Sequence, residues 1–260
     1  MIYIIVCLSA FLASGVTFFS GFGLGTVLMP VLAVFFPVPI AIMATAVVHF
    51  ANNLFKLYLV GRHINRFVLI RFGIPAVGAA LIGASLLSYV AALPVVGTYF
   101  LMGNMYVVTP IKLIIGICIM VFSVLEITPS FARIVISQKF MVLGGLLSGF
   151  FGGLSGNQGA FRSMFLIKSG LNKEEFVSTG IASSIMVDMA RLLVYGASIF
   201  AVQISTVSEI KWLILAVTLS AFLGAFLGRE LLKKVTLRSV QIIVAVMLIL
   251  FGGALSIGLL

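Results

Sequence analysis

The chain has 260 residues, of which 62% are hydrophobic and only 8% are charged, and its mean hydropathy is +1.32. So few charged residues cannot cover the surface of a soluble domain of this size, and continuous rather than alternating apolar runs exclude a transmembrane β-barrel. The formal net charge of +10 does not indicate nucleic-acid binding, because the basic residues gather in short stretches between apolar runs. The sequence therefore predicts an all-α polytopic protein of the lipid bilayer.

Eight apolar segments are predicted along the chain, several with the roughly 18–20 residues needed to cross a bilayer. They cover residues 2–36, 39–60, 67–91, 108–125, 140–168, 174–196, 210–230 and 239–259. The first is interrupted at Gly21–Gly25 and the fifth at Ser155–Gly159. Pro39 suits a first helical position, and Asn172 with Glu175 has capping-box spacing.

The interruptions belong to an internal repeat. "SGVTFFSGFGLG" at Ser14–Gly25 lines up with "SGFFGGLSGNQG" at Ser148–Gly159, at a constant offset of 134 residues (148 against 14). We expect one transmembrane domain over residues 1–260, with repeats at approximately 1–125 and 139–260. Each repeat would hold a broken helical hairpin followed by three transmembrane helices.

The basic loops indicate how the repeats are oriented. Residues 62–71 and 229–238 are both rich in Lys and Arg, which favours the cytoplasmic face for both. Both loops lie on the cytoplasmic face if each broken segment enters and leaves the membrane on the same side. Each half then crosses the membrane three times, and the two halves are inverted relative to each other. The alternative is eight full crossings with parallel halves, which the length of residues 2–19 permits.

Two apolar segments carry a stripe of polar residues on one helical face. The steps of three and four residues keep each stripe together. The stripes are Thr45, His49, Asn52, Asn53 and Lys56 in the first half, and Thr179, Ser183, Ser184, Asp188 and Arg191 in the second. Charged residues inside a membrane usually face the protein interior and serve a function. Snorkelling of Lys56 to the interface, and an ion pair of Arg191 with Asp188, are the alternatives.

The two glycine-rich interruptions are candidate binding elements. Irregular backbone at membrane depth is tolerated only where it is buried in protein or lines a wet cavity. Gly23, Gly25 and Gly159 would let a ligand approach, and half-helices beginning near Thr26 and Ala160 would point positive dipole ends inward. Close helix packing alone is the alternative role for these glycines.

The charges of the expected cavity favour an anion, because three cations face a single acid there. Cation carriers usually need more intramembrane carboxylates. His49 ionises near neutral pH and is a candidate carrier of a coupling proton, although a plain hydrogen bond to a neighbouring helix would serve equally. No cofactor or metal spacing is found. The candidate substrate-binding residues are Gly23, Gly25, His49, Asn52, Asn53, Lys56, Asn157, Gln158, Gly159, Arg162, Ser184, Asp188 and Arg191.

The whole chain resembles the TauE/SafE sulfite exporter family, also called the toluene-sulfonate uptake permeases. The likeness rests on "SGFGLGTVLMP", on "ATAVVHFANNLFK" and above all on "GGLLSGFFGGLSGNQGAFRSMFLIKSGLNKEEFVSTG". The resemblance implies a multi-pass transporter of the inner or plasma membrane that moves sulfite, a sulfonate or another sulfur oxyanion. It does not identify the substrate, the direction of transport or the coupling ion.

We therefore expect a secondary carrier for a small, sulfur-containing anion that works by alternating access. An anion channel is the alternative, and counterflow would distinguish the carrier. The chain lacks a Walker-type phosphate loop, so it is not expected to use ATP. An intramembrane enzyme would need a partnered nucleophile or metal set, and a scaffold would not need duplicated polar stripes. The sequence does not fix the oligomeric state.

Single-cysteine labelling tests the predicted topology in a background free of Cys7 and Cys118. Positions 64 and 236 should react from the cytoplasmic face, as should residues 168–173, whereas residues 95–105 and the C-terminus should react from outside. Labelling of positions 64 and 236 from opposite faces would contradict the inverted arrangement and favour eight crossings.

Overall fold

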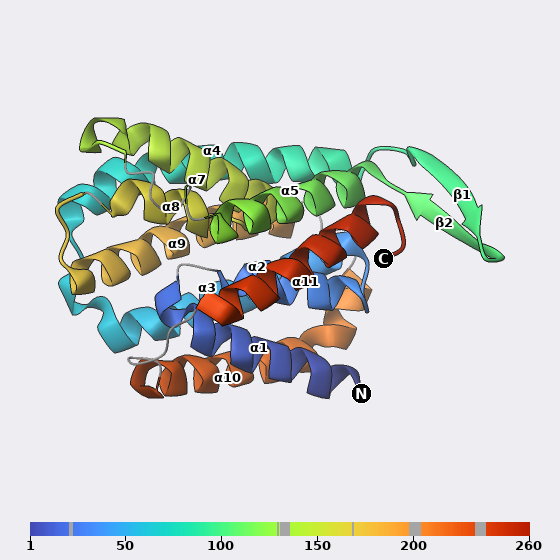
Figure 1. Cartoon of the computed structure of the whole chain (residues 1–260), viewed down its shortest axis with the longest axis horizontal. Helices are drawn as coiled ribbons and strands as arrows, with labels where there is room; N and C mark the ends of the chain where they lie inside the picture. The colour runs from blue at the N-terminus through green and yellow to red at the C-terminus, as the bar shows by residue number, and fades with distance from the viewer. Residues whose placement is uncertain (21–22, 129, 131–135, 168, 198–203, 232–237) are drawn as a thin grey trace.

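The computed structural model describes residues 1–20, 23–128, 130, 136–167, 169–197, 204–231 and 238–260. Helices make up most of this part of the chain and run along the long axis of the molecule (Figure 1). The first half contains α1 (Ile2–Ser20), α2 (Leu24–Ala33), α3 (Val38–Val60), η1 (Gly61–His63), α4 (Arg66–Ala91) and α5 (Pro110–Ile127). The second contains η2 (Gln138–Phe140), α7 (Met141–Ser155), α8 (Gly159–Leu166), α9 (Lys173–Tyr195), α10 (Ile204–Leu231) and α11 (Arg238–Ser256).

Five of the described helices are long and apolar enough to cross a membrane. They are α3, α4, α5, α9 and residues 210–229 of α10, while α1, α2 and residues 242–256 of α11 are shorter apolar helices. The prediction of a helical, multi-pass membrane protein is confirmed. The orientation of the repeats stays a prediction, and the basic positions 133, 168, 233 and 234 lie outside the described residues.

Both predicted interruptions are present. α1 ends at Ser20 and α2 begins at Leu24, and residues 21–22 between them lie outside the described part. α7 ends at Ser155, and α8 begins at Gly159. Gly156 closes α7 with a φ of +80°, a left-handed conformation that glycine adopts at little cost. α2 thus begins two residues before the expected start at Thr26, and α8 begins one residue before the expected start at Ala160.

The predicted capping box stops α9 from fraying at its start. The Asn172 side chain accepts a hydrogen bond from the Glu175 backbone N–H at 2.9 Å, and the Glu175 carboxylate accepts one from the Asn172 N–H at 3.1 Å. α3 begins at Val38 with Pro39 in its first turn, as the sequence indicates. Asn65 caps α4 in the same way, through the Val68 N–H at 3.1 Å.

The two halves are packed against each other helix by helix. α4 lies along α7, α1 along α10, α3 along α9, and α5 along α11. The first helix of each broken hairpin, α1 or α7, therefore packs on the second of the three long helices of the other half, α10 or α4. Three of these interfaces use glycines for close approach: Gly149 of α7 lies against Ala76 of α4, Gly224 of α10 against Phe11 of α1, and Gly116 of α5 against Gly252 of α11.

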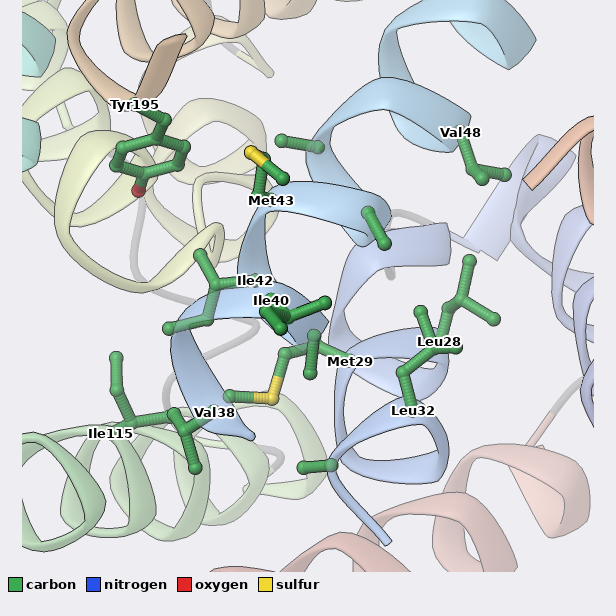
Figure 2. Packing of buried hydrophobic residues seen from close by; sticks show 14 of the residues in the cluster. Leu28, Met29, Leu32, Val38, Ile40, Ile42, Met43, Val48, Ile115 and Tyr195 are labelled. Carbon is green, nitrogen blue, oxygen red and sulfur yellow. The ribbon is translucent and has the colours of Figure 1, made fainter. Parts of the chain in front are cut away.

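An apolar core fills the molecule around the first half of α3 (Figure 2). Leu28, Met29 and Leu32 of α2 pack there against α3 residues between Val38 and Val48. Ile115 of α5 and Tyr195 of α9 close the cluster, and the Tyr195 hydroxyl donates a hydrogen bond to the Gly153 carbonyl oxygen. One end of α3 is therefore buried in apolar side chains, and its polar residues follow along the other end.

The stretch 92–108, which the sequence predicts only as an uncharged outer segment, forms a hairpin. Strand β1 (Gly97–Leu101) pairs antiparallel with β2 (Asn104–Val108), and the hairpin protrudes near the C-terminus (Figure 1). Met102 and Gly103 make the turn with φ values of 50° and 82°. The Tyr99 hydroxyl donates to the Ile257 carbonyl at 2.7 Å and holds the hairpin to the end of the chain.

Substituting Gly149 and Gly78 by alanine separates close packing from helix propensity. Both glycines lie in helices, where alanine is favoured by about 0.8–1 kcal/mol. A Cβ on Gly78 meets nothing within 4 Å, whereas a Cβ on Gly149 runs into the backbone of Ala76. We expect Gly78→Ala to keep or raise the melting temperature in detergent and Gly149→Ala to lower it. Equal effects of the two changes would contradict close packing of α7 on α4.

Candidate functional site

A polar cavity lies between α3, α8 and α9 and reaches α1 and the start of α2. Its volume is about 80 Å³. A cavity that holds one water molecule needs only about 10–15 Å³, so this cavity has room for several waters or for a small anion. The lining residues are Thr17, Gly23, Leu24, His49, Asn53, Lys56, Arg162, Ser163, Leu166, Phe176, Val177, Gly180, Ile181 and Ser184.

The cavity follows the antiparallel contact of α3 with α9. The Ser178 hydroxyl donates to the Val60 carbonyl at 2.5 Å near one end of this contact, and His49 meets Asp188 further along. The two polar stripes predicted from sequence therefore face each other. Val48 and Tyr195, beyond them, belong to the apolar core.

Asp188 is the centre of a buried network behind the cavity. One of its oxygens lies 2.6 Å from His49 Nδ1 and accepts a hydrogen bond from Asn53 Nδ2 at 3.1 Å. The other lies 2.8 Å from Arg191 Nη2 and accepts from Gln158 Nε2 at 3.4 Å. Asp188 is fully buried, so these four groups replace the water that a carboxylate requires.

Two further cations, Lys56 and Arg162, line the cavity itself. Lys56 Nζ donates to Thr17 Oγ1 at 3.5 Å, and only 5% of the lysine is exposed. Arg162 Nη1 donates to the Ser184 hydroxyl. Snorkelling of Lys56 to the membrane surface is thus excluded, because its side chain points inward. The expected ion pair of Arg191 with Asp188 is present.

The structure divides the candidate residues into three groups. Those at the cavity wall are Gly23, His49, Asn53, Lys56, Arg162 and Ser184. Asp188, Arg191 and Gln158 form the network behind it. Gly25, Asn52, Asn157 and Gly159 also lie outside the lining; of these, Asn52 accepts a hydrogen bond from the Ser14 hydroxyl at 3.1 Å.

Some residues of this region are missing from the sequence-based set. Thr17 and Ser163 line the cavity, yet small hydroxyl residues in apolar helices give no signal beyond their helical position. Glu126 of α5 interacts electrostatically with Arg162, and its Oε2 is buried without a hydrogen-bond partner. The expectation of a single acid near the site is therefore wrong. Glu126 lies one residue past the predicted end of its apolar segment at residue 125, but within α5.

No group of three or more His, Cys, Asp or Glu side chains that could hold a metal ion occurs among the described residues. The site instead offers hydrogen-bond donors: two cationic side chains, an amide, an imidazole and hydroxyl groups. Such a set binds oxyanions through charge-assisted hydrogen bonds.

Comparison with known proteins gives one finding. The family model described as "Sulfite exporter TauE/SafE" matches residues 6–255, nearly the full length of the chain. Neither the curated proteins nor the solved structures contain a match.

Replacing Arg191 by Gln tests the buried network. The substitution leaves Asp188 buried with its other partners but without its guanidinium, and loss of one partner of a buried pair typically costs about 3–5 kcal/mol. We expect a clear fall in the melting temperature of the purified protein, partly recovered by Arg191→Lys. The double variant Asp188→Asn/Arg191→Gln should be more stable than Arg191→Gln alone. A melting temperature unchanged by Arg191→Gln would show that the pair does not hold α9 in place.

Proposed function

The chain belongs to the sulfite exporter TauE/SafE family, and from this membership and the charges of its cavity we propose a secondary transporter that works by alternating access. The family is one of membrane transporters for sulfur-containing anions. The proposed substrate is sulfite, a sulfonate or a related sulfur oxyanion, and the proposed location is the inner or plasma membrane. The family assignment is the one that the sequence motifs indicate.

The observation that carries the proposal is the pair of cations at the cavity. Lys56 and Arg162 both line it, whereas the Asp188 carboxylate lies behind it and is matched by the Arg191 guanidinium. Glu126, the second acid, interacts with Arg162 from outside the lining, so Lys56, Arg162 and Arg191 still outnumber Asp188 and Glu126 by three to two. An anion entering the cavity would restore the balance, and a cation would be repelled.

The shape of the donor set suits an oxyanion with several oxygens. The planar guanidinium of Arg162 can bind two oxygens of one sulfonate or sulfite head, while Lys56 acts as a compact point charge. Asn53, His49 and Ser184 add neutral donors from α3 and α9. Leu166, Phe176 and Ile181 form an apolar part of the wall, which leaves space for a short organic substituent.

The position of the cavity supports alternating access. It lies toward the end of α3 and the start of α9, the same end of the molecule as the start of α4 and the end of α10, whose loops are basic (Figure 1). The apolar core around Met43 and Tyr195 closes the other direction. We propose that this is the inward-facing state.

Reciprocal packing of the two halves supports the inverted repeat that such a transporter needs. α1 packs on α10 as α7 packs on α4, which is the exchange expected of two halves related by a two-fold axis. In Figure 1, α1 and α7 run in opposite directions along the long axis. Motion of one half against the other would then open the outer side and close the inner one.

His49 is the proposed site for a coupling proton. Its Nδ1 is held by Asp188 at 2.6 Å, and the imidazole also lines the cavity. An imidazole that is anchored on one nitrogen can exchange a proton on the other when water fills the cavity. The charge of His49 would then change together with the anion that binds beside it.

Arg162 variants and an uptake panel test the proposal. Arg162→Gln should weaken sulfite binding by about 1.5–3 kcal/mol, the scale of a hydrogen bond to a charged group, and Arg162→Lys should recover part of this loss. Binding is measured as thermal stabilisation of purified protein. Transport is measured in proteoliposomes with sulfite, thiosulfate, sulfate and short sulfonates, including counterflow.

Lys112→Gln serves as the charge-matched control, because Lys112 lies at the start of α5, where its Nζ donates to the Val107 carbonyl at 3.2 Å. It removes one positive charge outside the cavity and should leave binding unchanged. Stabilisation by cations or neutral analogues, with none by anions, would contradict an anion carrier.

A further inference from the structure

A second set of polar groups lies one helical turn beyond His49, toward the apolar core. Thr45 precedes His49 by four residues on α3, and Arg191 follows Asp188 by three on α9. The two interruptions also meet at this level. A Cβ on Gly25 would lie 3.5 Å from Thr45 Cγ2 and 4.0 Å from the Gly156 carbonyl oxygen.

The guanidinium of Arg191 reaches the same place. Its Nη1 lies 2.8 Å from the position of a Cβ on Gly156, so the absent side chain of that glycine makes room for it. Asn157 follows Gly156 directly in the interruption. Thr45 and Arg191 thus lie where the two glycine-rich breaks touch, and Asn157 is the next residue of the second break.

Several polar atoms in this group have no hydrogen-bond partner in the protein. They are Thr45 Oγ1, both side-chain atoms of Asn157, Gln158 Oε1 and Arg191 Nε. Thr45, Asn157 and Arg191 are 3%, 4% and 1% exposed. Unpartnered polar atoms that are buried this deeply reduce stability, and apolar residues of the same shape would avoid the loss. Their presence therefore indicates a ligand that pairs with them during the working cycle.

The charge beside the unpaired groups favours an anion as that ligand. Arg191 Nε–H, Asn157 Nδ2 and the Thr45 hydroxyl can donate, Asn157 Oδ1 and Gln158 Oε1 can only accept, and the start of α8 has no side-chain cap. A metal cation is disfavoured because the Arg191 guanidinium lies among the available oxygens. Asp188 already shows that a carboxylate binds to this guanidinium, at 2.8 Å.

We infer that Thr45, Asn157 and Arg191 form a second binding position for the transported anion, deeper than the cavity at Lys56 and Arg162. This inference rests on the proposed transport function. The anion moves from the cavity past His49 to the meeting point of the two breaks, where it shares Arg191 with Asp188. Beyond it, among the described residues, lies the apolar core around Met43 and Tyr195.

Shape-matched variants separate this role from packing. Thr45→Val and Asn157→Leu keep the volume of the side chain and remove groups that have no partner, so they should preserve or raise the melting temperature. Sulfite should still stabilise both proteins, because the first position is intact. Sulfite uptake into proteoliposomes should fall about tenfold or more, since charge-assisted hydrogen bonds on the path are lost. Thr45→Ser keeps the hydroxyl and should retain uptake.

Ser123→Ala is the matched control. Ser123 is fully buried, but its hydroxyl donates to the Ile119 carbonyl at 2.7 Å within α5, outside the cavity and the breaks. The melting temperature, the stabilisation by sulfite and the sulfite uptake should all stay unchanged in this variant.

Normal sulfite uptake by both Thr45→Val and Asn157→Leu would overturn the second position. So would a lowered melting temperature that accompanies the loss of uptake, because the groups would then be structural. Loss of sulfite stabilisation together with uptake would assign the groups to the first position and overturn the inference as well. If the unaltered protein neither binds nor transports sulfite or any sulfonate, the proposed function itself fails.

Discussion

Burial of the Asp188 carboxylate is the constraint on which the interior depends. A lone carboxylate would not be stable in a membrane-embedded core, and here His49, Asn53, Gln158 and Arg191 compensate it from α3, the second interruption and α9. Because these partners come from both halves of the chain, the network also fixes how the halves meet. Lys56 and Arg162, the cations of the cavity wall, lie outside this network and beside the space proposed for a substrate anion.

Glycine has two separate roles in this fold. Along α7 and α10 it removes side chains, so that these helices approach α4 and α1 closely, as Gly149 does beside Ala76. In the interruptions it lets the backbone leave the helix, as Gly156 does with its left-handed conformation, and it leaves space for Arg191. The first role lets the helices pack closely, and the second leaves non-helical backbone groups inside the bundle.

The polarity of α3 changes along its length, and this gradient gives the interior a direction. Residues before Thr45 pack into the apolar core, whereas His49, Asn53 and Lys56 face the cavity. On the proposed path, an anion that enters beside Lys56 would pass His49, reach Arg191 and then meet the apolar core. In the proposed alternating-access cycle, the apolar core at this end would have to open, and movement of the two reciprocally packed halves would allow this without breaking the helices themselves.

The sequence by itself determined the membrane class, the helix segments, both interruptions, the family and the two polar stripes, because hydropathy, glycine pattern and helical period are local properties. It could not decide which polar residues share a cavity. Only tertiary packing brings α3 against α9, so that Arg162 faces the cavity while Arg191 lies behind it and pairs with Asp188. It also missed the β1–β2 hairpin and the buried oxygen of Glu126, since an uncharged linker and a carboxylate at a helix end acquire their roles only from the neighbours that the fold supplies.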